Sequence, residues 1–178
     1  MGAATQMQII EAENKALRAQ MNPHFIFNAM NSIQSQIGTG NDKEARYYLA
    51  KFSRLMRQIL DNSRNITISL EEEISTLENY LLIEQFCSGN RFEYEINVDL
   101  ETELSFIQIP PMLIQPFVEN AIIHGFKKLN EGGRLEVKFL TIADTFLHVE
   151  VRDNGLGYSN TVEKETNGHK SYGTKITS

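Results

Sequence analysis

The sequence LRAQMNPHFIFNAMNSI, residues 17–33, reads as one apolar helix that carries a histidine directly after a proline. A proline inside a helix removes a backbone donor and clashes with the preceding turn, at a cost of about 3 kcal/mol. We therefore expect a bend at Pro23, with His24 presented beside it. Because residues four apart share a helix face, Gln20, His24 and Asn28 form one polar stripe. The stripe is a candidate chemical site, although a lone histidine is more often a hydrogen-bonded core residue.

Repeated apolar positions continue on both sides of this stretch. They predict a long helix over about residues 3–37, which Gly38 and Gly40 end. A second amphipathic helix follows over about residues 42–63, where apolar residues recur at i, i+3, i+4 and i+7. Two helices joined by a short turn form an antiparallel hairpin, which alone cannot bury apolar residues on both faces. We expect a second copy of the chain to complete a four-helix bundle.

The pattern changes after residue 65. Ser69 and Glu72 have the spacing of a capping box and begin a third helix over about residues 70–86. The apolar period then becomes two, which predicts strands, and the last two predicted strands form an antiparallel hairpin. The predicted elements of this part are strands over 92–98, 106–109, 134–142 and 146–152, and a helix from Pro110 and Pro111 to about His124. The expected fold class is α+β, with a helical hairpin over residues 1–65 and an α/β sandwich over 66–178.

The composition limits the classes of function. The chain has 178 residues, of which 41% are hydrophobic and 22% are charged, as in an ordinary globular protein. A formal net charge of −6 argues against a nucleic-acid-binding surface, which would be strongly basic. The single cysteine, Cys87, has no disulfide partner and fits a reducing cytoplasm. Without a membrane-spanning run or a signal-peptide pattern, the chain itself is expected to be soluble.

One stretch of the second half is suited to binding a nucleotide base. The segment DNGLG, residues 153–157, supplies a carboxylate after a strand and then glycines that let the backbone approach a ligand. A buried carboxylate in that position can accept a hydrogen bond from an exocyclic amine such as that of adenine. Taken alone, the segment is more often a tight turn after a strand, and that alternative stays open.

A second stretch, QPFVENAIIHG at residues 115–125, offers a metal ligand and positive charge. The side-chain oxygen of Asn120 suits Mg²⁺, which usually keeps waters and bridges to substrate phosphates. His124 lies on the same helix face and, with Lys127 and Lys128, could offset phosphate charge. The plainer alternative for the two lysines is a solvated helix end that the helix dipole favours. No histidine has a second ligand at a recognisable spacing, so we expect no structural metal.

Four segments in this order closely resemble the LytS-type family of bacterial sensor histidine kinases: LRAQMNPHFIFNAMNSIQ, KFSRLMRQIL, IPPMLIQPFVENAIIHG and VRDNGLG. The match covers nearly the whole chain, and PHFIFN together with QPFVENAIIHG is highly specific. The resemblance implies a dimerising hairpin with a phosphoacceptor histidine over residues 1–65. It also implies, over residues 66–178, the ATP-binding fold that gyrase and Hsp90-like ATPases share.

The resemblance implies roles for individual residues. His24 falls on the phosphoacceptor, and Asn28 resembles the polar residue that positions water to hydrolyse phosphohistidine in related kinases. Asn120 falls on the Mg²⁺-binding asparagine of the N box, and Asp153 falls on the aspartate that reads adenine. Glu119, next to the metal-binding position, is a candidate base or polarising group. The other nucleotide-binding positions are His124 near the phosphates, Gly155 and Gly157 in the first glycine box, and Gly173 in a second glycine box.

Two features depart from the wider pattern. Most histidine kinases outside this family place an acidic residue after the histidine to take its proton, whereas Phe25 follows His24 here. The proton acceptor is therefore unassigned, and Gln20 or Asn28 could simply orient the imidazole. The sequence also stops at Ser178, just after the start of the second glycine box, whereas the family continues with another helix and strands. We therefore expect an ATP-binding domain that is incomplete at its C-terminal end.

The expected function is ATP- and Mg²⁺-dependent autophosphorylation of His24, followed by transfer of the phosphoryl group to an aspartate of a response regulator. The expected partners are a second copy of the chain and the receiver domain of that regulator, with a membrane reached only through an upstream segment. A signal arriving through a long N-terminal helix would rotate or bend the helices at Pro23, and residues 158–171 would form a lid over ATP. The competing interpretation is a non-catalytic dimerisation or scaffold module. A gyrase-type or Hsp90-type ATPase would not need the hairpin over residues 1–65.

Overall fold

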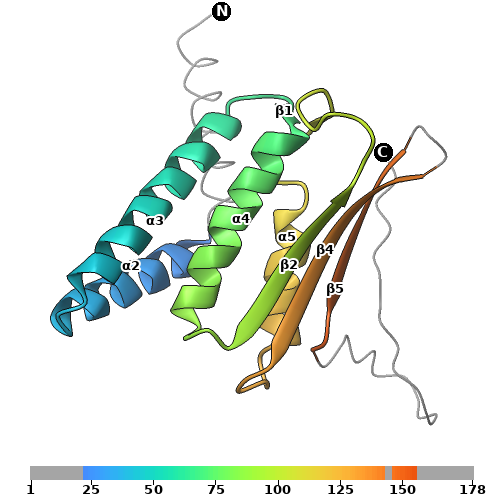
Figure 1. The fold of residues 1–178 in the computed structure, drawn as a ribbon. Helices are drawn as coiled ribbons and strands as arrows, with labels where there is room; N and C mark the ends of the chain where they lie inside the picture. Colours follow the sequence, from blue (N-terminus) through green and yellow to red (C-terminus); the bar gives the residue numbers. More distant parts are fainter. Residues whose placement is uncertain (1–21, 143–145, 156–178) are drawn as a thin grey trace, which may run out of the picture.

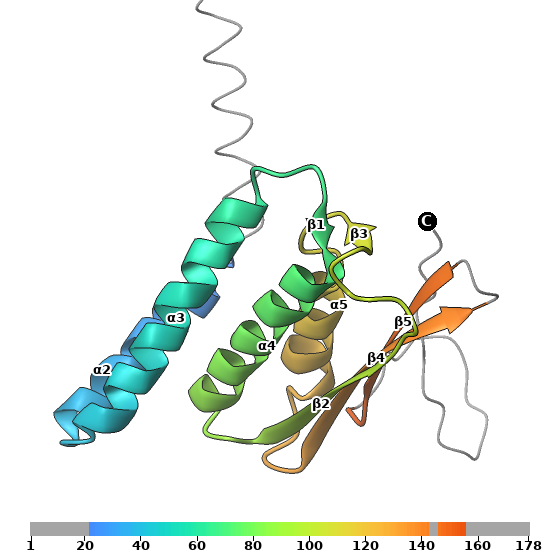
Figure 2. The same ribbon diagram turned by 45° about the horizontal axis from the view of Figure 1, so that its top comes forward.

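The computed structural model describes residues 22–142 and 146–155 of the chain. Helices α2 (Pro23–Gly38) and α3 (Asp42–Asn62) pack against each other and against α4 (Leu70–Cys87). Beyond α4 lies a sheet of β2 (Phe92–Asp99), β4 (Gly133–Ile142) and β5 (Phe146–Asp153), with α4 and α5 (Gln115–Asn120) over one of its faces (Figures 1 and 2). Helices and sheets are thus combined in one structure, which is compatible with the predicted α+β class.

The sheet has the order β2-β4-β5. Strand β2 pairs parallel with β4, and β4 pairs antiparallel with β5, so the predicted hairpin of the last two strands is confirmed. A parallel pair requires a crossover, and here the crossover contains β3 (Gln108–Ile109), α5 and the π-helical turn η1 (Ala121–Gly125). Strand β3 pairs antiparallel with β1 (Ile68–Ser69). The crossover therefore places the ENAIIHG segment, residues 119–125, over the sheet.

Helix α2 begins at Pro23 and does not run through it. Asn22 has an extended backbone (φ −66°, ψ 109°), and its side-chain oxygen accepts a hydrogen bond from the backbone N–H of His24 at 3.1 Å. Proline is well tolerated at the first helical position, because its missing N–H would have no partner there. The prediction of one continuous helix through Pro23 is therefore wrong, whereas the transmission of a signal at Pro23 stays a prediction.

The capping box at the start of α4 is confirmed: the Ser69 side chain accepts from the Glu72 N–H at 3.2 Å, and Glu72 accepts in return from the Ser69 N–H at 2.9 Å. The helix expected from Pro110 to His124 is shorter than predicted. It begins at Gln115, because residues 110–114 form a turn in which Met112 has a φ of +57°.

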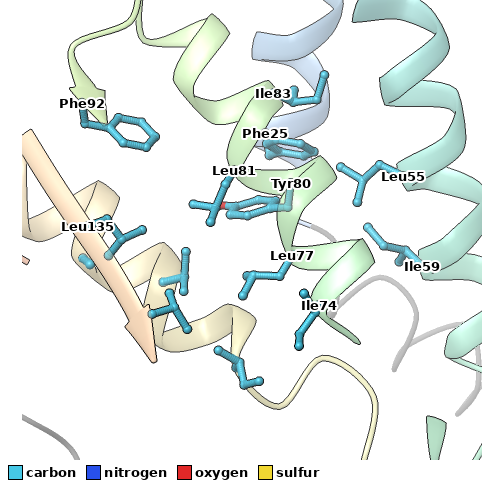
Figure 3. Packing of buried hydrophobic residues seen from close by; sticks show 14 of the residues in the cluster. Phe25, Leu55, Ile59, Ile74, Leu77, Tyr80, Leu81, Ile83, Phe92 and Leu135 are labelled. Carbon is cyan, nitrogen blue, oxygen red and sulfur yellow. The ribbon is translucent and has the colours of Figure 1, made fainter. Parts of the chain in front are cut away.

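The core is continuous from α2 and α3, through α4, to the sheet (Figure 3). Phe25 of α2 and Leu55 of α3 lie on one side of α4, and Leu135 of β4 lies on the other. Tyr80 and Leu81 of α4, both almost fully buried, join the two sides. Because α4 is covered on several sides, its buried residues do not form a single stripe. The predicted domain division near residue 65 stays a prediction.

Candidate functional site

The His24 imidazole lies at the exposed edge of α2, one turn before Asn28. The side-chain nitrogen of Asn28 is 3.2 Å from His24 Nδ1, so the polar stripe expected on this helix face is present for these two residues. Gln20, the third member of the stripe, lies outside the described residues. The Asn28 amide can turn either its nitrogen or its oxygen toward the ring. Nδ1 accepts a hydrogen bond in the first orientation and donates one in the second. In both cases the amide contacts Nδ1 and not Nε2.

The residue after His24 connects α2 to α4. The ring centroid of Phe25 is 5.0 Å from that of Tyr80 (Figure 3), and the Tyr80 hydroxyl donates to Glu84 Oε1 at 3.1 Å. Burial raises the pKa of the Glu84 carboxyl, and the nearby Glu119 also raises it. The Tyr80 hydrogen bond and His24 oppose this shift. Glu84 is 60 residues from His24 in the sequence, and its only local sequence signal is the i, i+4 spacing from Tyr80.

The N-box residues occupy the end of α5 and the π-helical turn that follows. Asn120 is the last residue of α5 and is exposed, as are His124 in η1 and Lys127 just beyond it. Glu119 is partly buried, and its Oε1 accepts from the Gln115 side-chain nitrogen at 2.8 Å. Burial raises the pKa of Glu119, and the Gln115 hydrogen bond opposes that shift. Single π-helical turns are rare and occur frequently at functional sites.

The turn after β5 packs directly on this π-helical turn. A Cβ atom placed on Gly125 would lie 2.7 Å from Asp153 Oδ1, and one on Gly155 would overlap the backbone of Gly125. The backbone N–H of Gly155 donates to Asp153 Oδ1 at 2.9 Å. The glycines thus allow the chain after the N box and the start of the DNGLG segment to touch. Gly125 is the last residue of the QPFVENAIIHG motif, and no local spacing in the sequence predicts its contact with Asp153.

Asn154 holds the same turn against the sheet. Its side-chain oxygen accepts from the Arg134 N–H at 2.7 Å, and its side-chain nitrogen donates to the Gly132 carbonyl at 2.9 Å. These two hydrogen bonds coexist with the contact between Asp153 and Gly125, and the tight-turn alternative stays open because residues 156 and 157 lie outside the described residues. Among the predicted glycines, Gly157 and Gly173 lie outside the described residues, as does the expected lid over 158–171.

These groups fit a nucleotide with Mg²⁺. The Asp153 carboxylate lies where Gly125 and Gly155 let the two segments touch, and Asn120 offers an exposed amide oxygen. Within residues 22–142 and 146–155, no group of three or more His, Cys, Asp or Glu side chains could hold a metal ion. None of the helices in that part is long and apolar enough to cross a membrane.

Comparisons with known proteins give a consistent result. A family model described as histidine kinase matches residues 12–92. The sensor histidine kinase/phosphatase LytS of Staphylococcus aureus strains Mu50, N315 and MW2 is 37% identical over 158 residues. Those residues make up 88% of this chain but 26% of each relative, so the chain spans about a quarter of the length of the curated relatives it matches.

Proposed function

Because the chain belongs to the LytS-type histidine kinase family, we propose that it forms the kinase core of a two-component sensor. In this proposal, His24 is phosphorylated by ATP and passes the phosphoryl group to an aspartate of a separate response regulator. The observation that carries the proposal is the contact of the Asp153 turn with Gly125. It joins the predicted adenine-reading and metal-binding segments within one site.

The proposed nucleophile is Nε2 of His24. Asn28 contacts Nδ1, and with the Asn28 amide oxygen turned toward the ring, Nδ1 keeps its proton and the Nε2 lone pair is available. Nε2 forms a bond to the γ-phosphorus while the bond from that phosphorus to the bridging oxygen breaks, and ADP leaves with the electron pair. The Nδ1 proton is later released to water. In such a transfer the protein acts mainly through positioning and charge stabilisation.

The nucleotide-binding roles follow from the placement of the side chains. Asp153 would accept the exocyclic amine of adenine, and the backbone at Gly155 would lie close to the base. Asn120 would hold Mg²⁺, which would supply positive charge to offset that of the phosphates. His124 in η1 and Lys127 just beyond it, both exposed, would add positive charge near the phosphates.

The proposed homodimer uses the apolar residues that α2 and α3 leave exposed. On α2 the side chains of Phe27, Met30 and Ile37 are 66%, 57% and 55% exposed, and Leu60 of α3 is 43% exposed. Exposed apolar residues at helical spacing favour burial against a second copy. A response regulator receiver domain is the proposed partner for the phosphoryl group. We also propose that the chain is the cytoplasmic part of a membrane-bound sensor.

Replacing Phe27 by glutamate is expected to shift the protein from dimer to monomer, because a charge would be buried in the proposed interface. Size-exclusion chromatography with light scattering measures the mass directly. Phe106→Glu is the matched control, since Phe106 is 75% exposed on a loop outside the two helices, and it should leave the mass unchanged. A Phe27→Glu protein with the wild-type mass would contradict this interface.

The proposed function is tested by incubating the chain with γ-labelled ATP and Mg²⁺. We expect label that is labile in acid and stable in base, as for a phosphoramidate, and its complete loss in His24→Ala. His148→Ala, which changes a histidine on β5, should keep the label. The proposal would be refuted if the label persisted in His24→Ala or if the wild-type protein took no label. Either result would favour the non-catalytic scaffold interpretation.

A further inference from the structure

Asn154 directly follows β5 and continues the pairing of that strand through its side chain. Because Asp153 pairs with Leu135, the antiparallel register places Asn154 opposite Arg134. The backbone N–H of Asn154 donates to the Arg134 carbonyl at 3.2 Å, as in a regular ladder. The Arg134 N–H, in contrast, donates to the side-chain oxygen of Asn154 at 2.7 Å. The Asn154 side chain thus takes the place that its own backbone carbonyl would have in the ladder.

The side-chain nitrogen of Asn154 extends the ladder by one more step. It donates to the Gly132 carbonyl at 2.9 Å. In an antiparallel pair the hydrogen-bonded positions alternate, so residues 132 and 134 both direct their backbone groups toward β5. One amide group therefore pairs the two backbone groups that a longer β5 would have paired. The chain can leave the sheet after Asn154 without leaving Gly132 or Arg134 unpaired.

This departure brings Gly155 onto the π-helical turn η1. A Cβ atom on Gly155 would overlap the Gly125 backbone, so the two segments are in direct contact there. The Gly155 N–H donates to Asp153 Oδ1 at 2.9 Å, which leaves Asp153 Oδ2 as an acceptor. Asp153 pairs with the buried Leu135, so its side chain lies on the face of the sheet that the helices cover. The turn that Asn154 holds therefore fixes the direction of this carboxylate.

We propose that Asn154 is a positioning residue for base recognition. Its side-chain amide replaces the end of the ladder, so that residues 153–155 close on Gly125 and Asp153 is held where Oδ2 selects a purine with an exocyclic amine. The inference rests on the proposed function, in which Asp153 accepts a hydrogen bond from adenine. It deepens that function by assigning the discrimination between purines to a residue that acts only through Asp153.

A purely structural role of Asn154 makes a different prediction. If the side chain only stabilised the end of β5, its removal would weaken the binding of every nucleotide by the same factor. If it fixes Asp153, its removal weakens only those nucleotides whose base offers an amine to that carboxylate. The ratio of two affinities therefore separates the two roles, whereas a single affinity does not.

The test compares ATP with purine riboside triphosphate, which differs from ATP only in lacking the exocyclic amine. Both are titrated by calorimetry, with Mg²⁺, into the full chain. The wild type is expected to bind ATP about tenfold to a hundredfold more tightly, because without the amine the Asp153 carboxylate has no donor. In Asn154→Ala this preference should fall to about threefold or less, mainly through weaker binding of ATP.

Asn97→Ala is the matched control for this comparison. The Asn97 side chain also reaches from a neighbouring strand to β4, where its nitrogen donates to Glu136 Oε1 at 3.3 Å. That hydrogen bond does not involve the turn at residues 153–155. Asn97→Ala should therefore keep the wild-type preference for ATP.

A second measurement needs no nucleotide. Hydrogen exchange of the Arg134 amide, followed by NMR, should be about tenfold faster in Asn154→Ala, because that N–H loses its acceptor. Asn154→Asp keeps the acceptor oxygen and loses the donor to Gly132. It should keep the Arg134 amide protected and show a preference for ATP between those of Asn154→Ala and the wild type. Circular dichroism shows whether each variant is folded.

The outcomes separate the possible failures. The role of Asn154 is overturned if folded Asn154→Ala keeps the wild-type preference for ATP, if both nucleotides lose affinity equally, or if exchange at Arg134 is unchanged. If Asn154→Ala does not fold, the preference of Asn154→Asp decides by the same criteria. Equal binding of both nucleotides by the wild type overturns base selection through Asp153 and leaves the nucleotide site standing. Binding of neither refutes the nucleotide site itself, and this inference with it.

Discussion

Replacing Glu73 by alanine is expected to lower the free energy of unfolding by about 3 to 5 kcal/mol. The Glu73 side chain is 2% exposed, and its two oxygens accept the backbone N–H groups of Met112 at 2.9 Å and Ile114 at 3.2 Å. Without the carboxylate, these donors lose their partners inside the protein, and each buried unpaired group costs about 1–3 kcal/mol. Urea unfolding followed by circular dichroism measures the change.

A matched control is available on the same helix. Glu78→Ala removes an exposed carboxylate from α4 and should change stability by no more than about 0.5 kcal/mol. Glu73→Gln keeps one acceptor oxygen and should fall between the alanine variant and the wild type. Equal stability of Glu73→Ala and Glu78→Ala would show that the 110–114 turn does not depend on this carboxylate.

The same residue gives a pH dependence. Burial raises the pKa of Glu73 above its ordinary value, although the backbone N–H groups of Met112, Ile114 and Leu113 partly oppose the shift. The folded state therefore keeps this proton to a higher pH than the unfolded state. The contribution of Glu73 to stability is then expected to decrease as pH rises from the ordinary carboxyl range to the raised value. Glu73→Gln should remove that part of the pH dependence.

Adding one methyl group at Gly125 is expected to weaken ATP binding about tenfold to a hundredfold. A Cβ atom there would lie 2.7 Å from Asp153 Oδ1 and 3.2 Å from Asp153 Cγ, so the carboxylate must move. Its displacement would break the hydrogen bond proposed to read adenine, and a hydrogen bond involving a charged group contributes about 1.5–3 kcal/mol. Calorimetric titration of Gly125→Ala with ATP and Mg²⁺ measures the loss.

Gly38→Ala is the control for this experiment. Gly38 is the last residue of α2, and a Cβ atom there would meet no atom within 4 Å, so ATP affinity should be unchanged. Thermal unfolding of both variants separates a local effect from a loss of fold. Wild-type affinity in Gly125→Ala would contradict the role of the Asp153 contact. No ATP binding by the wild-type chain would instead refute the nucleotide site.

Local spacing was enough to predict most of the elements. The Ser69 and Glu72 capping box, the 42–63 helix and the last two strands all follow from residues within a few positions of each other. Two predictions of local structure were wrong, at Pro23 and at Pro110 and Pro111. In the first, the Asn22 side chain caps the helix at the proline; in the second, Glu73 holds the turn from 39 residues away.

The sequence by itself indicated the family, the polar pair of His24 and Asn28, and the order of the proposed nucleotide-binding motifs, because these depend on residue types at short, fixed spacings. Only the tertiary structure decided which charges and glycines meet. Phe25 meets Tyr80 because α2 packs against α4, and Gly125 meets Asp153 because the crossover returns over the sheet. Such contacts depend on the packing of whole elements, and no pattern in neighbouring residues specifies them.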